Sequence, residues 1–126
     1  MIEVVCALIF ESNRILVCQR PFDKHEGGKW EFPGGKVEPE ETPQGALRRE
    51  IKEELGVSVQ VGKEMTPAEL GKIKLMPYRC ELQEEDLVLN EHLAMKWITA
   101  EEIPFLDWAA ADIPISQQVA RLIRVG

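Results

Sequence analysis

One stretch of this 126-residue chain constrains its fold more than any other, because it carries signals for both ends of a helix. Thr42 suits the N-cap, Pro43 the first helical position, and Gly56 the C-terminal stop. Between these limits one side of the helix is apolar, formed by Leu47, Ile51 and Leu55. This four-residue spacing predicts an amphipathic helix over 43–55 that packs against a core.

Runs rich in Val, Ile and Leu lie on both sides of this helix and are typical of strands. The first two, 2–11 and 14–20, are separated only by Ser12 and Asn13, which predicts a hairpin. Further strand-like runs are 30–32, 57–62, 72–82, which Pro77 marks as an edge strand or a bulge, and 93–99. With a last helix expected at 113–125, the order predicts an α/β (α+β) sandwich.

Composition narrows the classes of function. The net charge is −7, and no stripe of Lys and Arg interleaved with aromatic residues suggests a nucleic-acid polymer as partner. The apolar run 2–11 carries Glu3 and is too short to span a bilayer, so we expect no membrane association and a cytoplasmic protein. The length predicts one domain, residues 1–126. The cysteines are spaced like no zinc site and are expected in the core: Cys6, Cys18 and Cys80.

The predicted helix ends in an acidic cluster that its own dipole disfavours. Glu50, Glu53 and Glu54 lie three or four residues apart, and two of them occupy the last turn, where the dipole is negative. Like charges at this spacing cost roughly 0.2–0.5 kcal/mol per pair. A divalent cation such as Mg²⁺ would reverse that cost, because it binds several oxygen ligands. The alternative is a solvated charged face.

The residues around this cluster follow a longer pattern, G-x5-E-x7-R-E-U-x-E-E-x-G-U, where U is an aliphatic residue. The chain matches it at every position from Gly35 to Val57. In this respect it resembles the Nudix hydrolases, whose defining box this is. The stretch GKWEFPGGKVEPEETPQGALRREIKEELG is similar to the MutT-type branch and to the CTP pyrophosphohydrolases. The resemblance implies a Nudix-type mixed β-sheet sandwiched between helices, with the box, 35–57, forming a loop–helix–loop.

The resemblance also implies a metal site for Mg²⁺, for which Mn²⁺ can substitute. The ligands carried over to this chain are the carbonyl of Gly34 and the side chains of Glu50, Glu53, Glu54 and Glu91. Glu91 matches a glutamate that MutT-type enzymes contribute from a distant loop, and its alternative role is that of an ordinary loop acid. Glu50 is expected to accept a proton from the attacking water or to orient it.

A further pair implied by the resemblance consists of Arg49 and Glu41, whose contact fixes the geometry of the box. The implied catalytic residues are therefore Glu41, Arg49, Glu50 and Glu53. Lys36, just inside the box, is a candidate contact for a substrate phosphate, although loop lysines mostly face solvent.

In the MutT-type branch, the base pocket is lined by groups that match Arg20, the backbone of Phe32 and the residue at Asp112. Many of those enzymes have asparagine at the last position, and this chain has aspartate. An ionised carboxylate only accepts hydrogen bonds, which favours the amino group of cytosine or the N–H and amino groups of an oxidised guanine. A protonated aspartate could also donate, and Asp112 could also cap the last helix.

Several other side chains could complete the pocket or simply pack. Trp30, Met76 and Tyr78 could supply stacking or apolar walls for the base, but aromatic and methionine side chains on strands are more often core. His25 and His92 lie in polar segments, where we expect solvated loop residues and not catalytic bases.

Together these features predict a Mg²⁺-dependent hydrolase that splits a nucleoside triphosphate into a monophosphate and pyrophosphate. The expected substrates are an oxidised guanine nucleotide such as 8-oxo-dGTP, or the cytosine nucleotides CTP and dCTP. One alternative is a Nudix hydrolase of another nucleoside diphosphate derivative, such as a nucleotide sugar. An alternative of a different class is a nucleotide-binding module without catalysis. The protein is expected to be a monomer or a homodimer.

Overall fold

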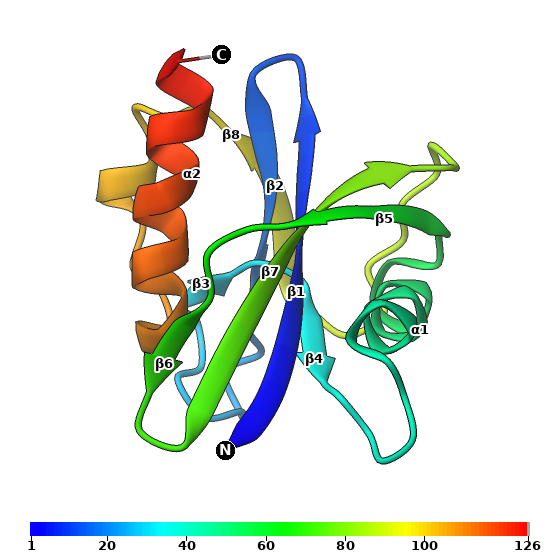
Figure 1. Cartoon of the computed structure of the whole chain (residues 1–126). Coiled ribbons are helices and arrows are strands. Elements are labelled where there is room, and N and C mark those ends of the chain that lie inside the picture. The colour runs from blue at the N-terminus through cyan, green and yellow to red at the C-terminus, as the bar shows by residue number, and fades with distance from the viewer. Residues whose placement is uncertain (126) are drawn as a thin grey trace.

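The computed structural model describes residues 1–125, and Figure 1 labels its elements in chain order. The strands are β1 (Ile2–Glu11), β2 (Arg14–Gln19), β3 (Trp30–Glu31), β4 (Gly34–Lys36), β5 (Val59–Glu64), β6 (Ala68–Leu70), β7 (Ile73–Leu82) and β8 (Ala94–Ile98). The helices are α1 (Pro43–Leu55), the 3₁₀ turns η1 (Ile103–Phe105) and η2 (Ala110–Asp112), and α2 (Ile113–Val125). Both predicted helices are therefore confirmed.

A mixed sheet forms the middle of the fold. Its strands run in the order β3-β2-β1-β7-β5; β1 and β7 are parallel, whereas the other paired strands are antiparallel. The predicted hairpin joins β1 to β2, and its turn residues Ser12 and Asn13 have φ angles of 50° and 62°, as a type I′ turn requires. β4 pairs with the first half of β1, and the loop that follows it leads outward into α1 (Figure 1).

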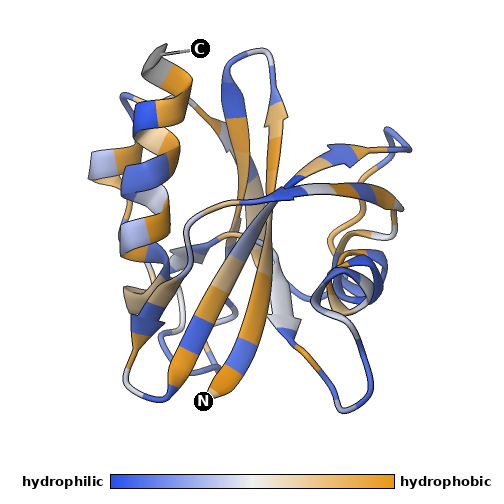
Figure 2. Cartoon of the chain, viewed as in Figure 1, coloured by the Kyte–Doolittle hydropathy of each residue, from blue (hydrophilic) through white to orange (hydrophobic). Residues whose placement is uncertain are grey.

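The sheet has one helix on each face, which confirms the predicted sandwich (Figure 1). Because side chains alternate along a strand, Val5 and Ala7 of β1 face α1, while Cys6 and Leu8 face the side of α2. Figure 2 shows the corresponding apolar bands along the central strands. The three cysteines are buried and unpaired, as predicted.

Helix α1 begins and ends where the sequence predicted. The Thr42 side chain accepts a hydrogen bond from the N–H of Gly45 at 3.0 Å, and Gly56 takes a left-handed conformation with φ 70°. The apolar stripe is fully buried and consists of Leu47, Ile51 and Leu55. Each of these side chains contributes roughly 1.5–3 kcal/mol through burial. This packing fixes which side of α1 presents the glutamates to the sheet.

The strands agree only in part with the sequence expectations. Pro77 lies inside β7 beside β1, so it marks no edge, but the expected bulge lies next to it, where the β5–β7 register shifts between Val61 and Glu64. The strands β4 and β6 were not predicted, because three residues show too little alternation. Within residues 1–125, neither helix has the length and apolar character that crossing a membrane requires.

Candidate active site

The acidic face of α1 lies against the two glycines that begin β4. The N–H of Gly34 donates to Oε1 of Glu54 at 3.2 Å. A Cβ atom at Gly35 would come within 2.6 Å of both carboxylate oxygens of Glu50. Gly35 therefore allows the helix to bring Glu50 directly against the strand, whereas a Cβ atom at Gly34 would meet the backbone of Val5 in β1.

Arg49 holds several of these acids in place. Its Nε and Nη2 atoms donate to the two oxygens of Glu41 at 2.7 and 2.9 Å, and its Nη1 donates to Glu50 at 2.8 Å. These contacts lower the pKa of Glu41 to about 2, with the Arg49 hydrogen bond as the main cause. The sequence-predicted pair Arg49–Glu41 is thus brought together, and it also restrains Glu50.

The carboxylates of Glu50 and Glu54 border a small acidic cavity of about 220 Å³. Its lining consists of Arg20, Pro21, Lys24, Glu31, Gly34, Glu50, Glu54, Glu91 and His92. Burial raises the pKa of Glu54, and the hydrogen bond and charge of Glu50 raise it further, followed by the charges of Glu31 and Glu91. A buried group that resists ionisation in this way is suited to a cation.

The fit of this cavity to a divalent cation follows from its donors. Gly34, Glu50, Glu54 and Glu91 together offer carboxylate and carbonyl oxygens, which are the ligands that Mg²⁺ prefers. Glu53 lies at the margin, because its side chain is 50% exposed and contacts Arg49 at 3.5 Å. Among the described residues, no group of three or more acidic, histidine or cysteine side chains is already placed so that it could hold a metal ion.

Two of the candidate base-binding groups, Asp112 and Phe32, meet on the other face of the sheet. Oδ1 of Asp112 accepts a hydrogen bond from the N–H of Phe32 at 3.1 Å, and the Phe32 ring packs on Trp108 with centroids 5.1 Å apart. Asp112 is 6% exposed, and burial raises its pKa well above the usual range, an effect that Glu31 increases and the Phe32 N–H partly offsets. Asp112 lies directly before α2, where it could bind the base or cap the helix. The hydrogen bond that its side chain makes is to Phe32 and not to the helix.

The structure corrects the grouping of Tyr78 with these base-binding groups. Tyr78 and Met76 belong to the core cluster under α1, whereas Phe32 and Trp30 belong to the cluster under α2. Both Tyr78 and Met76 are buried packing residues on the opposite face from Phe32. The sequence gives the alternation along β7 but not which helix covers each face.

Arg20 connects the two halves of the site through Glu31. Its Nη1 donates to Oε1 of Glu31 at 2.8 Å, and Oε2 of the same carboxylate lies 2.9 Å from Nε2 of His92. The side chain of His92 is only 5% exposed, so the expectation of a solvated loop histidine is wrong for His92. It is confirmed for His25, whose side chain is 90% exposed.

Comparison with known proteins decides the family. A family model described as the NUDIX domain matches residues 2–119. The chain belongs to the NUDIX family. Its box, 35–57, is therefore the segment that carries Gly35, Arg49 and the glutamates described above.

Relatives that match most of this chain or part of it have related names. The CTP pyrophosphohydrolase of Escherichia coli K12 is 40% identical over 119 residues, which cover 91% of this chain and 88% of the relative. The 8-oxo-dGTP diphosphatase of Proteus vulgaris is 55% identical over 49 residues, covering 39% of this chain and 44% of the relative. The crystal structure of the MutT protein from Methanosarcina mazei Go1 has a TM-score of 0.79 and 28% identity, covering 96% of this chain and 94% of that one.

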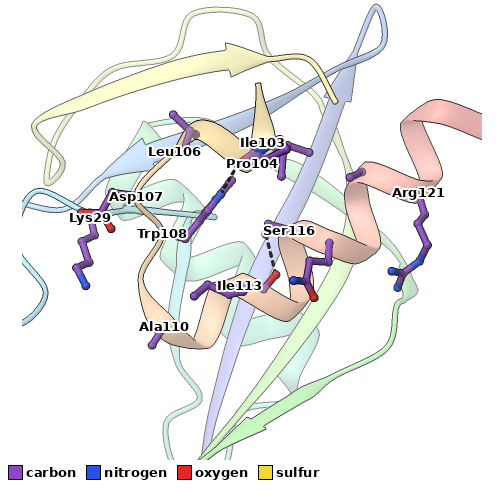
Figure 3. Close-up of a pocket in the computed structure, with 12 residues that line it drawn as sticks. Lys29, Ile103, Pro104, Leu106, Asp107, Trp108, Ala110, Ile113, Ser116 and Arg121 are labelled. Carbon is purple, nitrogen blue, oxygen red and sulfur yellow. Dashed lines mark hydrogen bonds between the residues drawn. The ribbon is translucent and has the colours of Figure 1, made fainter. Parts of the chain in front are cut away.

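A larger cavity of about 650 Å³ lies outside the Nudix box, between η1 and α2 (Figure 3). Trp108 forms one wall, with its indole N–H donating to the carbonyl of Ile103, and Lys29 and Arg121 lie at its margins. No site residue predicted from the sequence is among its lining residues. The larger cavity lacks a group of carboxylates. The smaller acidic cavity is therefore the candidate site in this Nudix chain.

Three polar residues that line the acidic cavity were not predicted as site residues, namely Glu31, His92 and Lys24. The alternation of WEF contains a signal for the first: Trp30 and Phe32 face the α2 side, so Glu31 points the other way, toward Glu54. No local pattern marks His92, because its burial depends on contacts with β3 and α1. Lys36 is exposed and contacts Arg49 through its carbonyl at 3.2 Å, so its phosphate contact stays a prediction.

Proposed function

We propose that this Nudix hydrolase splits a nucleoside triphosphate into a nucleoside monophosphate and pyrophosphate, using Mg²⁺ or Mn²⁺. The observation that carries the proposal is the acidic cavity in which Glu50, Glu54 and Glu91 surround the backbone of Gly34. The names of the relatives, a CTP pyrophosphohydrolase and an 8-oxo-dGTP diphosphatase, support the triphosphate class. We further propose that residues 1–126 form one Nudix domain.

The cation would be held by the carbonyl of Gly34 and the carboxylates of Glu50, Glu53, Glu54 and Glu91. When bound, it supplies Lewis acidity that neutralises phosphate charge and makes water a stronger nucleophile. The negative charge of the chain is no obstacle, since the cation attracts both the protein's carboxylates and the substrate's phosphates.

The residues of the chain then position the reaction. Glu50 accepts a proton from the attacking water or orients it, while the water oxygen bonds to the β-phosphorus and the bond to the α-phosphate oxygen breaks. Arg49 restrains Glu50 through a contact of 2.8 Å, and Glu41 fixes the other edge of the guanidinium. Lys36 supplies positive charge for the phosphates, and Arg20 supplies it beside the pocket that binds the base.

The base is read by Asp112 and the backbone of Phe32. The Asp112 carboxylate accepts hydrogen bonds when ionised, and the buried neutral acid can donate one as well. This chemistry matches the amino group of cytosine and the N–H and amino groups of 8-oxoguanine. CTP, dCTP and 8-oxo-dGTP are therefore the proposed substrates.

A panel of nucleotides tests the proposal. The purified protein is incubated with Mg²⁺ and CTP, dCTP, methylated dCTP, 8-oxo-dGTP, dGTP or a nucleotide sugar, and substrates are ranked by kcat/KM. Pyrophosphate and a monophosphate are the expected products, and E53Q is expected to lose at least about 100-fold in kcat while retaining its fold. Release of orthophosphate would contradict the cleavage site. Turnover of the nucleotide sugar alone would replace the substrate class, and binding without turnover would favour the non-catalytic module.

A further inference from the structure

His92 is a buried polar side chain with one unused nitrogen. Its side chain is 5% exposed, and its Nδ1 has no hydrogen-bond partner among the residues that the structure describes. Leaving a buried polar atom unpaired costs roughly 1–3 kcal/mol, so such an atom calls for an explanation.

The segment that carries His92 is anchored on both sides. The N–H of Asn90 donates to the carbonyl of Glu54 at 3.1 Å, at the end of α1, and the N–H of Leu93 donates to the carbonyl of Gln19 at 2.9 Å. The neighbouring residue, Glu91, borders the same acidic cavity as His92. The position of the imidazole ring is therefore set by the fold and not by a free loop.

The other ring nitrogen fixes the ring's orientation. Nε2 of His92 lies 2.9 Å from Oε2 of Glu31, whose Oε1 is held by Arg20 at 2.8 Å. Because a carboxylate paired with arginine accepts hydrogen bonds, Nε2 is the nitrogen that donates to Glu31. In the tautomer that carries its hydrogen on Nε2, the lone pair is on Nδ1. Rotating the ring to satisfy Nδ1 elsewhere would break the contact with Glu31.

Nδ1 lies close to one of the proposed metal ligands. Nδ1 lies 4.0 Å from Oε1 of Glu54, the oxygen that also accepts from Gly34. Two donors of one octahedral ion, each at about 2.1 Å, are separated by at most about 4.2 Å. A histidine that gives its second N–H to a carboxylate and leaves the first nitrogen free is the usual arrangement of a metal-binding histidine.

We propose that His92 is a ligand of the divalent cation, bound through Nδ1, and that Glu31 and Arg20 orient it for this purpose. The inference rests on the proposed function in one respect, namely that the carboxylates of the cavity hold a cation. A nitrogen ligand favours transition metals such as Mn²⁺ and Co²⁺ over Mg²⁺, which prefers oxygen. Arg20 thereby links the base side of the site to the metal through Glu31.

The chain offers a clean spectroscopic test because it contains only two histidines, His25 and His92. The H25Q variant, whose substituted residue is exposed, is labelled with ¹⁵N-histidine and loaded with Mn²⁺. Electron spin-echo envelope modulation of the bound Mn²⁺ is then compared with that of the unlabelled H25Q protein. A directly bound His92 is expected to give a ¹⁴N modulation that changes to the ¹⁵N frequency on labelling.

The H92Q variant provides the second measurement. It is expected to lose the nitrogen modulation and to bind Mn²⁺ about 10–100-fold more weakly than H25Q does, with a smaller change for Mg²⁺. Bound Mn²⁺ without nitrogen modulation in unlabelled H25Q would overturn the proposal, as would modulation that persists in H92Q. If H92Q does not fold, the labelling of H25Q decides alone.

The outcomes separate this inference from the proposed function. Wild-type protein that binds Mn²⁺ and releases pyrophosphate, but shows no nitrogen modulation, would overturn only the histidine ligand. Wild-type protein that binds no Mn²⁺ at all would overturn both the ligand and the metal-dependent function.

Discussion

Among single residues, Arg49 makes the most contacts with the acidic cluster. Its guanidinium reaches four carboxylates at 2.7 to 3.8 Å, those of Glu38, Glu41, Glu50 and Glu53. The contact with Glu41 uses two parallel N–H bonds, which a lysine ammonium cannot reproduce. Arg49 therefore positions Glu50 through geometry as well as charge.

R49K is expected to lower kcat by about 10–100-fold, since it keeps the charge but loses the paired hydrogen bonds to Glu41. E41Q is expected to lower kcat by a similar amount, and the double variant by less than the product of the two effects, because both changes break one contact. The measurement is kcat and KM for the preferred triphosphate. E38Q is the control, because its contact with Arg49 is 3.8 Å long and exposed. Wild-type kcat in R49K would contradict this role.

Gly35 has no Cβ atom, and this allows the Glu50 carboxylate to lie directly against the strand. In G35A the new Cβ atom would meet the Glu50 oxygens at 2.6 Å and displace the carboxylate. We expect at least about a tenfold loss of kcat, in line with the effect of misplacing a catalytic group by about 1 Å. G71A is the control: it replaces a glycine with φ 58° that has no neighbour within 4 Å, so it costs stability without reaching the site. Equal kcat in both variants would count against the steric argument.

Among the secondary-structure elements, α1 matters most because it carries the box glutamates. Its first turn depends on Thr42, whose side chain accepts from Gly45 at 3.0 Å. T42A is expected to cost about 1 kcal/mol in the free energy of unfolding, a drop in Tm of roughly 3–5 °C. T66A makes the same chemical change at an exposed threonine whose hydrogen bonds use only its backbone, and it is expected to unfold near the wild-type temperature. Thermal unfolding followed by circular dichroism compares the two, and an equal Tm would exclude the cap as a source of stability.

The same element shows how far the sequence determines the structure. The bounds of α1 follow from local signals, because Thr42, Pro43 and Gly56 act within one turn of the residues they control. The Arg49–Glu41 contact was anticipated from the box pattern, whereas the closeness of Glu50 to Gly35 emerged only from the structure. The central hairpin was equally local, since its register depends on a two-residue turn.

Features that depend on distant contacts could not be predicted in this way. The pattern along β7 shows that Tyr78 is on an apolar face of the strand. That this face is covered by α1, and so belongs to the core, depends on where the helix packs. His92 is buried because α1, β2 and β3 converge on its segment, and nothing in the residues beside it announces this. The sequence therefore predicted the carboxylates of the site better than the groups that orient them.

For the whole molecule, an excess of negative charge accompanies a cavity lined by several carboxylates. The net charge is −7, and four glutamates border the cavity: Glu31, Glu50, Glu54 and Glu91. Burial, followed by Glu50 and the other two acids, raises the pKa of Glu54 above its ordinary value of 4.5. Above pH 4.5 the unfolded chain releases this proton before the folded protein does, so the folded state binds more protons. The metal-free protein therefore loses stability as pH rises, whereas a bound cation adds stability.

E54Q isolates this effect, because glutamine keeps the shape of the side chain and cannot ionise. In EDTA, we expect the Tm of the wild-type protein to fall relative to that of E54Q as pH rises from 5 to 8. If ionising Glu54 costs the folded protein on the order of 1 kcal/mol, the difference is several degrees. Mg²⁺ at a hundred times its Kd should then raise the stability of the wild type by about 2.7 kcal/mol, and that of E54Q by much less. KCl at the same ionic strength controls for screening, which acts on both proteins. Parallel pH profiles for the two proteins, or equal gains from Mg²⁺, would show that Glu54 neither carries the electrostatic cost nor binds the cation.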